Sequence, residues 1–438
     1  MKIKINKKNT LFTILVFYFL VAYFNRSFVG IMIFGFRLGE FIVLFGLLLS
    51  LFYFISGNIG FKNNKILLFY RLIILSFLIS LFLNNGSFIS SYTYKSSSYI
   101  WMVSYIFLGK YFSKHKLIPS SSYLVLGLLP LFSYIFSTGN YPNFIIDFFN
   151  QFSDKFQFTK ASDSFHLILI VCLFISFYIN KVFYKLLFIY TITFLFLPLL
   201  LYQSRGSFVG IILFLLLESF YFRKYIVNNL KSYLLILLIS SIALIFTLYR
   251  VSDIDFFEFT EEPVQNITTT SSQIIENKDT LETLFSFYYL DGRIFSTDST
   301  TNWRLDIWQD VIEDLNLKGK NLIGYGYNEV IPIMLDGSAP GRLGRDGMNE
   351  HVHNYFFTII SRGGYVQLIF FLSFYFYLIK EWYSNSKNLR IFSYLVPVFF
   401  VSFLDISMDG VHFPLIFFLT LGYILTNKQI QEIYGVEE

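Results

Sequence analysis

Polar side chains that could bind phosphate or accept a proton occur in three places along an otherwise apolar chain. Arg205 and Arg304 lie about a hundred residues apart, and the pair His351 and His353 follows. A guanidinium can donate two parallel hydrogen bonds to phosphate oxygens. A histidine can accept a proton near neutral pH. These residue types therefore predict chemistry on a phosphorylated substrate, assisted by a base.

Each of these residues also has a purely structural explanation. Arg205 could be an interfacial arginine whose side chain reaches the lipid headgroups. Arg304 could be an exposed arginine, although the helix dipole does not favour a cation in the first turn of a helix. The histidines could form a polar helix start capped by Asn354. The His351-x-His353 spacing could supply metal ligands, but no further metal-binding spacing occurs, so we expect no metal.

The chain that must position these residues is strongly apolar. Hydrophobic residues make up 55% of the 438 residues and charged residues only 14%, compared with about 25% charged residues in an average protein. This composition predicts an integral membrane protein rather than a soluble domain. The single cysteine, Cys172, excludes an internal disulfide. The net charge of +5 is explained by lysines and arginines in the loops, so we expect no nucleic-acid partner.

Twelve apolar segments approach the length of about 20 residues that a helix needs to cross a bilayer. They are residues 11–24, 41–55, 66–83, 99–112, 117–136, 165–179, 184–202, 208–222, 233–249, 365–379, 391–404 and 411–425. The predicted fold is therefore an all-α integral membrane protein with about twelve transmembrane helices. Nine of these helices lie in residues 1–249 and three in residues 354–438, with one large loop, residues 250–353, between them.

The lysines and arginines of the short loops set the predicted orientation, because cytoplasmic loops carry an excess of them. The side of the N-terminus holds 18 of them and the other side six, namely Arg26, Arg37, Lys95, Lys155, Lys160 and Arg205. Both termini are therefore predicted to be cytoplasmic. The loop of residues 250–353 follows the ninth predicted helix and is predicted to face the periplasm.

The large loop is predicted to be partly ordered. Apolar residues recur at helical spacing from Leu305 to Leu315, which predicts an amphipathic helix over residues 302–317. The glycine-rich stretch 337–347 predicts irregular structure. The glycine pair at 363–364 is expected to break a helix before the membrane core.

The order of these motifs resembles that of the O-antigen ligase and O-antigen polymerase superfamily of bacterial envelope glycosyltransferases. The long outward loop before the last three helices is part of the resemblance. The motifs that carry it are Ser-Arg-Gly at 204–206, Arg304 with Trp308, Gly-Tyr-Gly at 324–326, His-Asn-Tyr at 353–355 and Gly-Gly at 363–364.

The resemblance implies an enzyme of the bacterial inner membrane that takes a glycan from undecaprenyl pyrophosphate. It implies that Arg205 and Arg304 contact the pyrophosphate and that His353 acts on the acceptor hydroxyl. Arg362 stands where many members carry an acidic residue, and we expect it to be a further pyrophosphate contact. We also expect Asn354 and His351 as supporting residues, although His351 has no clear counterpart in the family. Arginines in the phosphate-binding role would make the reaction independent of a metal or other cofactor.

The alternatives within this class of enzyme differ in the acceptor that receives the glycan. A ligase-like protein transfers the glycan to lipid A–core, whereas a polymerase transfers it to another lipid-linked repeat unit. A flippase for lipid-linked oligosaccharides is a different alternative, and so is a receptor whose loop binds a partner. Transporters favour internal repeats and charges near the membrane midplane. Here no repeat is detected and Arg71 is the clearest charge within a predicted span, so we expect a ligase-like glycosyltransferase.

Overall fold

The computed structural model describes residues 7–56, 61, 63–114, 130, 133–135, 141–155, 159–176, 179–251, 286–336, 339, 342–343 and 349–426. The molecule is mostly helical, at 76%. The first half of the chain contains α1 (Lys7–Val29), β1 (Met32–Ile33), β2 (Phe36–Arg37), α2 (Leu38–Ser56), α3 (Asn64–Leu83), α4 (Ser91–Ser96), α5 (Ser98–Met102), α6 (Tyr105–Lys114), α8 (Asn143–Phe152), α9 (Ala161–Ser176), α10 (Val182–Gln203), α11 (Arg205–Tyr221), α12 (Arg223–Asn228) and α13 (Leu230–Val251).

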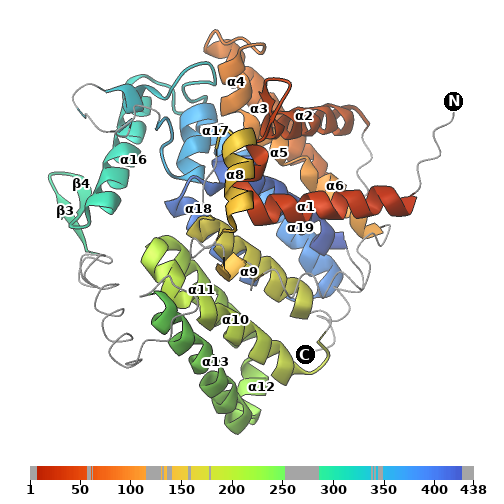
Figure 1. Cartoon of the computed structure of the whole chain (residues 1–438). Coiled ribbons are helices and arrows are strands. Elements are labelled where there is room, and N and C mark those ends of the chain that lie inside the picture. The colour runs from red at the N-terminus through yellow and green to blue at the C-terminus, as the bar shows by residue number, and fades with distance from the viewer. Residues whose placement is uncertain are drawn as a thin grey trace.

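The second half begins with polar elements and ends with apolar helices. It contains β3 (Phe287–Leu290), β4 (Arg293–Ser296), α16 (Ser299–Leu317), the 3-10 helix η1 (Pro332–Leu335), α17 (Tyr355–Ser386), α18 (Phe392–Leu404), the 3-10 helix η2 (Ser407–Asp409) and α19 (His412–Thr426). Figure 1 shows α16 and the β3–β4 hairpin at the end of the helix bundle that lies away from the N-terminus.

The apolar helices identify a multi-pass membrane protein. Among the described residues, five helices are long and apolar enough to cross a membrane, namely α2, α3, α10, α13 and α17. Shorter apolar helices cover Val16–Val29, Ala161–Ile175, Phe392–Leu404 and His412–Thr426. The predicted count of about twelve spans stays a prediction, because most of the predicted span 117–136 lies outside the described residues.

The predicted span 99–112 is divided into α5 and α6 by a turn at Val103 and Ser104. The Ser104 hydroxyl donates to the carbonyl oxygens of Gly46 and Trp101, at 2.9 and 2.8 Å. A side chain that bonds nearby backbone carbonyls competes with regular helix geometry. This is the physical reason why one apolar segment forms two short helices.

Helix α17 starts ten residues before the predicted span 365–379 and is kinked at Gly364, where φ is 71° and ψ is −177°. The prediction that the glycine pair breaks the helix is confirmed. An added Cβ at Gly364 would lie 2.3 Å from the Leu322 backbone, so both the left-handed φ and the close approach require glycine. The helix can therefore pack directly against the loop that follows α16.

The apolar helices pack in pairs, α10 with α13, α6 with α19, α3 with α17 and α11 with α18. A buried ion pair joins the last of these pairs. Arg390, just before α18, donates to Glu218 of α11 at 2.8 Å, and each side chain is 1% exposed. A buried charge is tolerated when it is paired and hydrogen-bonded, so this contact fixes where α18 lies along α11.

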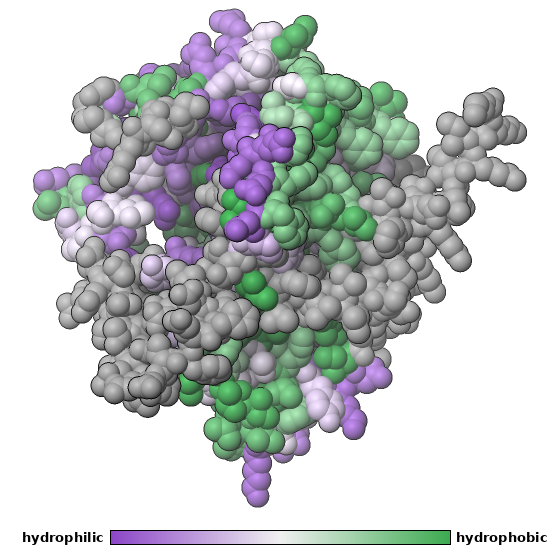
Figure 2. Space-filling view, viewed as in Figure 1, coloured by the Kyte–Doolittle hydropathy of each residue, from purple (hydrophilic) through white to green (hydrophobic). Residues whose placement is uncertain are grey.

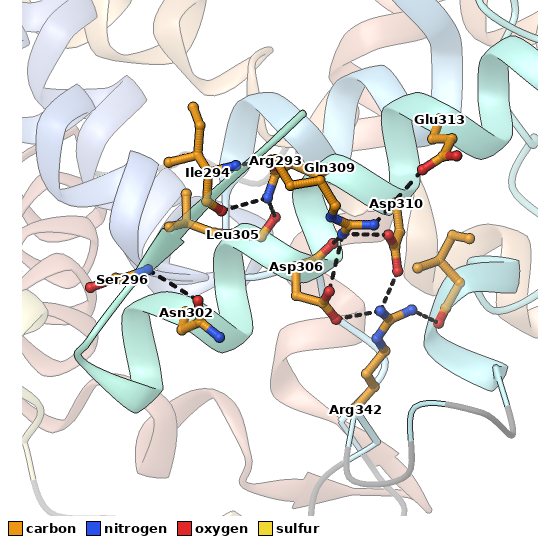
Figure 3. Close-up of polar contacts among 11 residues, drawn as sticks. Arg293, Ile294, Ser296, Asn302, Leu305, Asp306, Gln309, Asp310, Glu313 and Arg342 are labelled. Carbon is orange, nitrogen blue, oxygen red and sulfur yellow. Dashed lines mark hydrogen bonds and ion pairs between the residues drawn. The ribbon is translucent and has the colours of Figure 1, made fainter. Parts of the chain in front are cut away.

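The described part of the large loop is ordered, and the helix predicted over residues 302–317 is confirmed as α16. The helix begins three residues earlier because the Asp298 carboxylate caps it by accepting from the Thr301 amide at 2.7 Å. Figure 3 shows Arg293 of the hairpin and Arg342 both pairing with Asp306 and Asp310 of α16. These contacts hold the hairpin and the segment at Arg342 against the helix.

Candidate functional site

Arg205 is joined to the large loop by an ion pair. It is the first residue of α11, and its Nη1 lies 2.7 Å from Oδ2 of Asp298, the cap of α16. Burial alone would raise the pKa of Asp298, but the hydrogen bonds from Thr301 and the charge of Arg205 lower it. Asp298 therefore stays ionised and holds the start of α16 at the end of α11.

Arg304 lies in the second turn of α16 and has no ion-pair partner among the described residues. Its Nε is buried without a hydrogen-bond acceptor. Burial lowers the pKa of Arg304, whereas the charges of Asp405 and Asp298 act in the opposite direction without forming an ion pair. A guanidinium that is desolvated but not neutralised is a strong donor for an anion that enters the site.

His353 lies next to the first turns of α16. Its ring contacts the Trp303 ring at 5.1 Å between centroids, and its Nε2 lies 2.9 Å from Oδ1 of Asn349. An amide oxygen only accepts hydrogen bonds, so Nε2 carries the hydrogen and Nδ1 keeps its lone pair. Burial, followed by the charge of Arg304, lowers the pKa of His353 to about 4. The ring is therefore neutral and can accept a proton at Nδ1 at neutral pH.

The backbone at His353 is held in a conformation that residues other than glycine rarely adopt, with φ at 53°. Contacts on both sides fix it. The Trp308 Nε1 donates to the Val352 carbonyl at 2.7 Å, and Asn354 caps α17 by accepting from the amides of Phe356 and Phe357. Such strained residues often occur at functional sites. The structural role expected for Asn354 as a helix cap is therefore present.

Asp405 is a site residue that the sequence analysis missed. It follows α18 directly and its negative charge acts on both Arg304 and His353. A carboxylate near His353 favours the protonated ring, which is the form that a base adopts after it has taken a proton. In the sequence, Asp405 could have been noticed as an acidic residue in the short connection between the apolar segments 391–404 and 411–425.

Arg362 lies among backbone carbonyls on α17. Its guanidinium donates to the carbonyl oxygens of Gly326 and Glu329 and to the Tyr92 hydroxyl at 3.1 Å. These contacts connect α17 to the Gly-Tyr-Gly segment 324–326. Its expected contact with pyrophosphate stays a prediction, and the observed contacts position the loop.

The two glycine motifs of the sequence meet in the structure. The Tyr325 amide donates to the Ser361 carbonyl at 2.7 Å, and the Gly326 amide donates to the Arg362 carbonyl. Gly324 has φ at 67° and packs against the Arg362 backbone. Only glycine allows this approach of two backbones at a positive φ. The motifs at 324–326 and 363–364 therefore build one junction between the large loop and α17.

His351 lies beside a second carboxyl group, with its Nδ1 at 3.8 Å from Oδ2 of Asp409. Burial lowers the pKa of His351 to about 3 and raises the pKa of Asp409 to about 7. The Thr358 hydroxyl donates to Asp409 at 2.8 Å. Asp409 lies on the same connection, between α18 and α19, that carries Asp405. The pair is electrostatically coupled to the group of Arg304 and His353, because the charge of His353 acts on His351 and the charge of Asp405 acts on Asp409.

The site as a whole combines cations, a neutral base and acidic residues at one end of an apolar bundle. Figure 2 shows hydrophilic side chains on both sides of a recess on this face, with α16 on one side and α8 on the other. In the described part of the chain, no group of three or more His, Cys, Asp or Glu is placed to hold a metal ion. The arrangement can bind an anion at Arg304 and accept a proton at His353.

The fold and this site define a multi-pass helical membrane protein that carries arginines, histidines and acidic residues together at one end of its bundle. The sequence model of the O-antigen ligase family matches residues 190–372, from α10 to the middle of α17. This match confirms the resemblance to the O-antigen ligase and polymerase superfamily and supports a membrane glycosyltransferase of that type. The matched segment contains Arg205, Arg304, His353 and Arg362. No curated protein matches the chain.

Proposed function

We propose that the protein transfers a glycan from undecaprenyl pyrophosphate to an acceptor hydroxyl. The observation that carries the proposal is the half-buried Arg304, whose Nε is buried without an acceptor. Its guanidinium has no ion-pair partner among the described residues and lies near the neutral His353. A pyrophosphate would supply the missing negative charge. The O-antigen ligase match over residues 190–372 supports a lipid-linked glycan as the substrate class.

The reaction needs little beyond positioning, stabilisation of charge and removal of one proton. The bond between the anomeric carbon and the pyrophosphate oxygen breaks, and undecaprenyl pyrophosphate leaves with the bonding electrons. Arg304 and Arg205 stabilise the charge that develops on this leaving group, which is often the largest contribution to catalysis. The acceptor oxygen attacks the opposite face of the sugar, so a single displacement inverts the anomeric carbon.

His353 accepts the proton that the acceptor hydroxyl loses. The lone pair of Nδ1 receives it, because Nε2 already carries a hydrogen toward Asn349. Asp405 then stabilises the imidazolium. Base assistance of this kind contributes about 10²–10⁴-fold to a rate. Arginines act on the phosphates throughout, so the proposed reaction is independent of a metal.

The proposed site faces the periplasm, and the protein lies in the bacterial inner membrane with both termini in the cytoplasm. The excess of lysine and arginine in the short loops on the side of the N-terminus supports this orientation. In this arrangement, residues 1–249 and 354–438 form the membrane helices. Residues 250–353 form the periplasmic loop that carries Arg304.

The proposed acceptor is lipid A–core, and another glycan repeat unit is the alternative that the same chemistry serves. Glycan analysis of a deletion strain distinguishes them. Accumulation of lipid-linked polymer without its attachment supports the ligase, whereas single repeat units indicate a polymerase. Lipid-linked units that remain inside the cell would indicate a flippase and would overturn the proposed reaction.

A further inference from the structure

Helix α8 carries an exposed stripe of three phenylalanines near the candidate site. Phe144, Phe148 and Phe152 recur every four residues, so they share one face of the helix. Their exposed fractions are 72%, 46% and 44%. Figure 1 shows α8 in the middle of the viewed face, where it overlaps the end of α1. No helix was predicted over residues 143–152, and the predicted transmembrane helices do not explain the role of α8.

The other two sides of α8 have different environments. Phe149 is buried and its ring lies 5.0 Å from the Phe24 ring of α1. Asn143, Asp147, Asn150 and Gln151 form an exposed polar side, which Figure 2 shows as a hydrophilic strip on the viewed face. At 3.6 residues per turn, Phe148 and Asn150 point in widely different directions. The helix thus has one side toward protein, one polar side and one exposed aromatic side.

The position of α8 relative to α1 is fixed by contacts at the end of α1. The Ser153 hydroxyl donates to the Ser27 carbonyl at 2.8 Å, and Ser153 also forms a β-bridge with Ile31. The C-terminal end of α8 therefore lies where α1 leaves the bundle. The same place carries Phe34, which is 95% exposed at the tip of the β1–β2 hairpin.

Cationic side chains accompany these exposed aromatic residues. Arg37 of the hairpin pairs with Asp154, the second residue after α8, and Lys155 follows. Aromatic residues are enriched at membrane–water interfaces, and cations there attract anionic headgroups. An amphipathic helix with aromatic residues on one face and polar residues on the other lies in the interface plane.

We propose that α8 is an interfacial helix whose phenylalanine stripe is inserted in the lipid leaflet on the side of the candidate site. The C-terminal end of α8 lies beside the end of α1, and the proposal places the lipid headgroups at this level. Lipid then lies along one side of α8 and water along its polar side, at the rim of the recess beside α16. The inference rests on the membrane location of the protein and not on the proposed transfer reaction.

Spin labels on two faces of α8 test this placement. Single cysteines are introduced at Phe148→Cys and, as the matched control on the same helix, at Asn150→Cys, both in a Cys172→Ser background. The labelled proteins are reconstituted in vesicles of phosphatidylcholine and phosphatidylglycerol. Power saturation then measures accessibility to oxygen, which concentrates in lipid, and to a neutral nickel chelate, which stays in water. Thermal melting in detergent verifies that both variants are folded.

The expected result is an oxygen-to-nickel accessibility ratio that is several-fold higher at position 148 than at position 150. Equal ratios with ready access of the nickel chelate at both positions would overturn the proposal, because the stripe would face water. A label at position 148 that neither reagent reaches would also overturn it. In that case another protein surface, such as a second copy of the chain, covers the stripe.

Discussion

Arg205 and Asp298 form an ion pair of 2.7 Å that joins the first residue of α11 to the cap of α16. The two residues are 93 positions apart in the chain. The contact brings Arg205 and Arg304 to the same end of the bundle, because Asp298 carries a charge that acts on both. One acidic residue therefore couples the membrane helices to the loop that carries the proposed phosphate-binding arginine.

The base role is tested by replacing the two histidines separately. His353→Gln should reduce glycan transfer by about 10²-fold or more, because the residue loses the Nδ1 proton acceptor. It should still bind the donor lipid, since Arg205 and Arg304 are unchanged. His351→Gln, the matched control, should keep most of the activity. Purified proteins with equal melting temperatures are compared in a transfer assay, and full activity of His353→Gln would remove the histidine from the mechanism.

The pH dependence of the reaction should follow the lowered pKa of His353. The base is active when neutral, so the rate should stay constant from neutral pH down to about pH 5 and fall as pH passes about 4. A free histidine would lose activity near its ordinary pKa of about 6.5. The pH profile of kcat/KM measures this value in the free enzyme. A midpoint near 6.5 would contradict the buried environment of the ring.

Asp405→Asn should shift this acidic limb to lower pH. The carboxylate favours protonated His353, so its removal lowers the pKa of the ring further. The variant should also lose roughly 10-fold in kcat, a part of the contribution that base catalysis makes. The same pH profile provides the measurement. An acidic limb that moves to higher pH, or an unchanged kcat, would place Asp405 outside the site.

The buried Arg390–Glu218 pair should be important for stability rather than for transfer. Glu218→Ala leaves Arg390 without its carboxylate in an apolar environment and should cost about 3–5 kcal/mol. Asp154→Ala provides a control, because it removes an ion pair whose Arg37 side chain is 42% exposed, and such pairs contribute about 0–1 kcal/mol. Thermal melting in one detergent compares the variants. Equal melting temperatures would show that the pair does not hold α18 on α11.

The orientation of the protein is tested with single cysteines in the Cys172→Ser background. Thr300→Cys lies on α16 and Asn228→Cys lies at the end of α12, and both native side chains are exposed. A membrane-impermeant thiol reagent should label position 300 in intact cells with a permeable outer membrane. Position 228 should react only after the inner membrane is opened. The reverse pattern would place the site on the cytoplasmic face.

The sequence predicted the apolar helices and α16, because helical periodicity and apolar runs are local properties of the chain. It also singled out Arg304 and His353, whose residue types are unusual beside apolar segments. The roles of these two residues in substrate binding and catalysis remain predictions. Local patterns do not reveal which distant residues meet.

The missed features depend on contacts across the fold. Asp298 and Asp405 are ordinary acidic residues in the sequence and become important only through Arg205, Arg304 and His353. The junction of the glycine motifs at 324–326 and 363–364 is another such contact. Helix α8 was missed because it is short, with ten residues, and four of these residues are polar.

The central claim, that Arg304 binds the pyrophosphate of the donor, is tested most directly with Arg304→Ala and Arg304→Lys. Both purified variants are assayed for transfer from an undecaprenyl-pyrophosphate-linked glycan in liposomes, with a chelator present, and their melting temperatures are measured in parallel. Lysine keeps the charge but loses the bidentate geometry. The account predicts a nearly inactive alanine variant, an impaired lysine variant and melting temperatures no lower than that of the unmodified protein, because the guanidinium has no ion pair to lose among the described residues. Unchanged transfer by a folded Arg304→Ala variant would contradict the account.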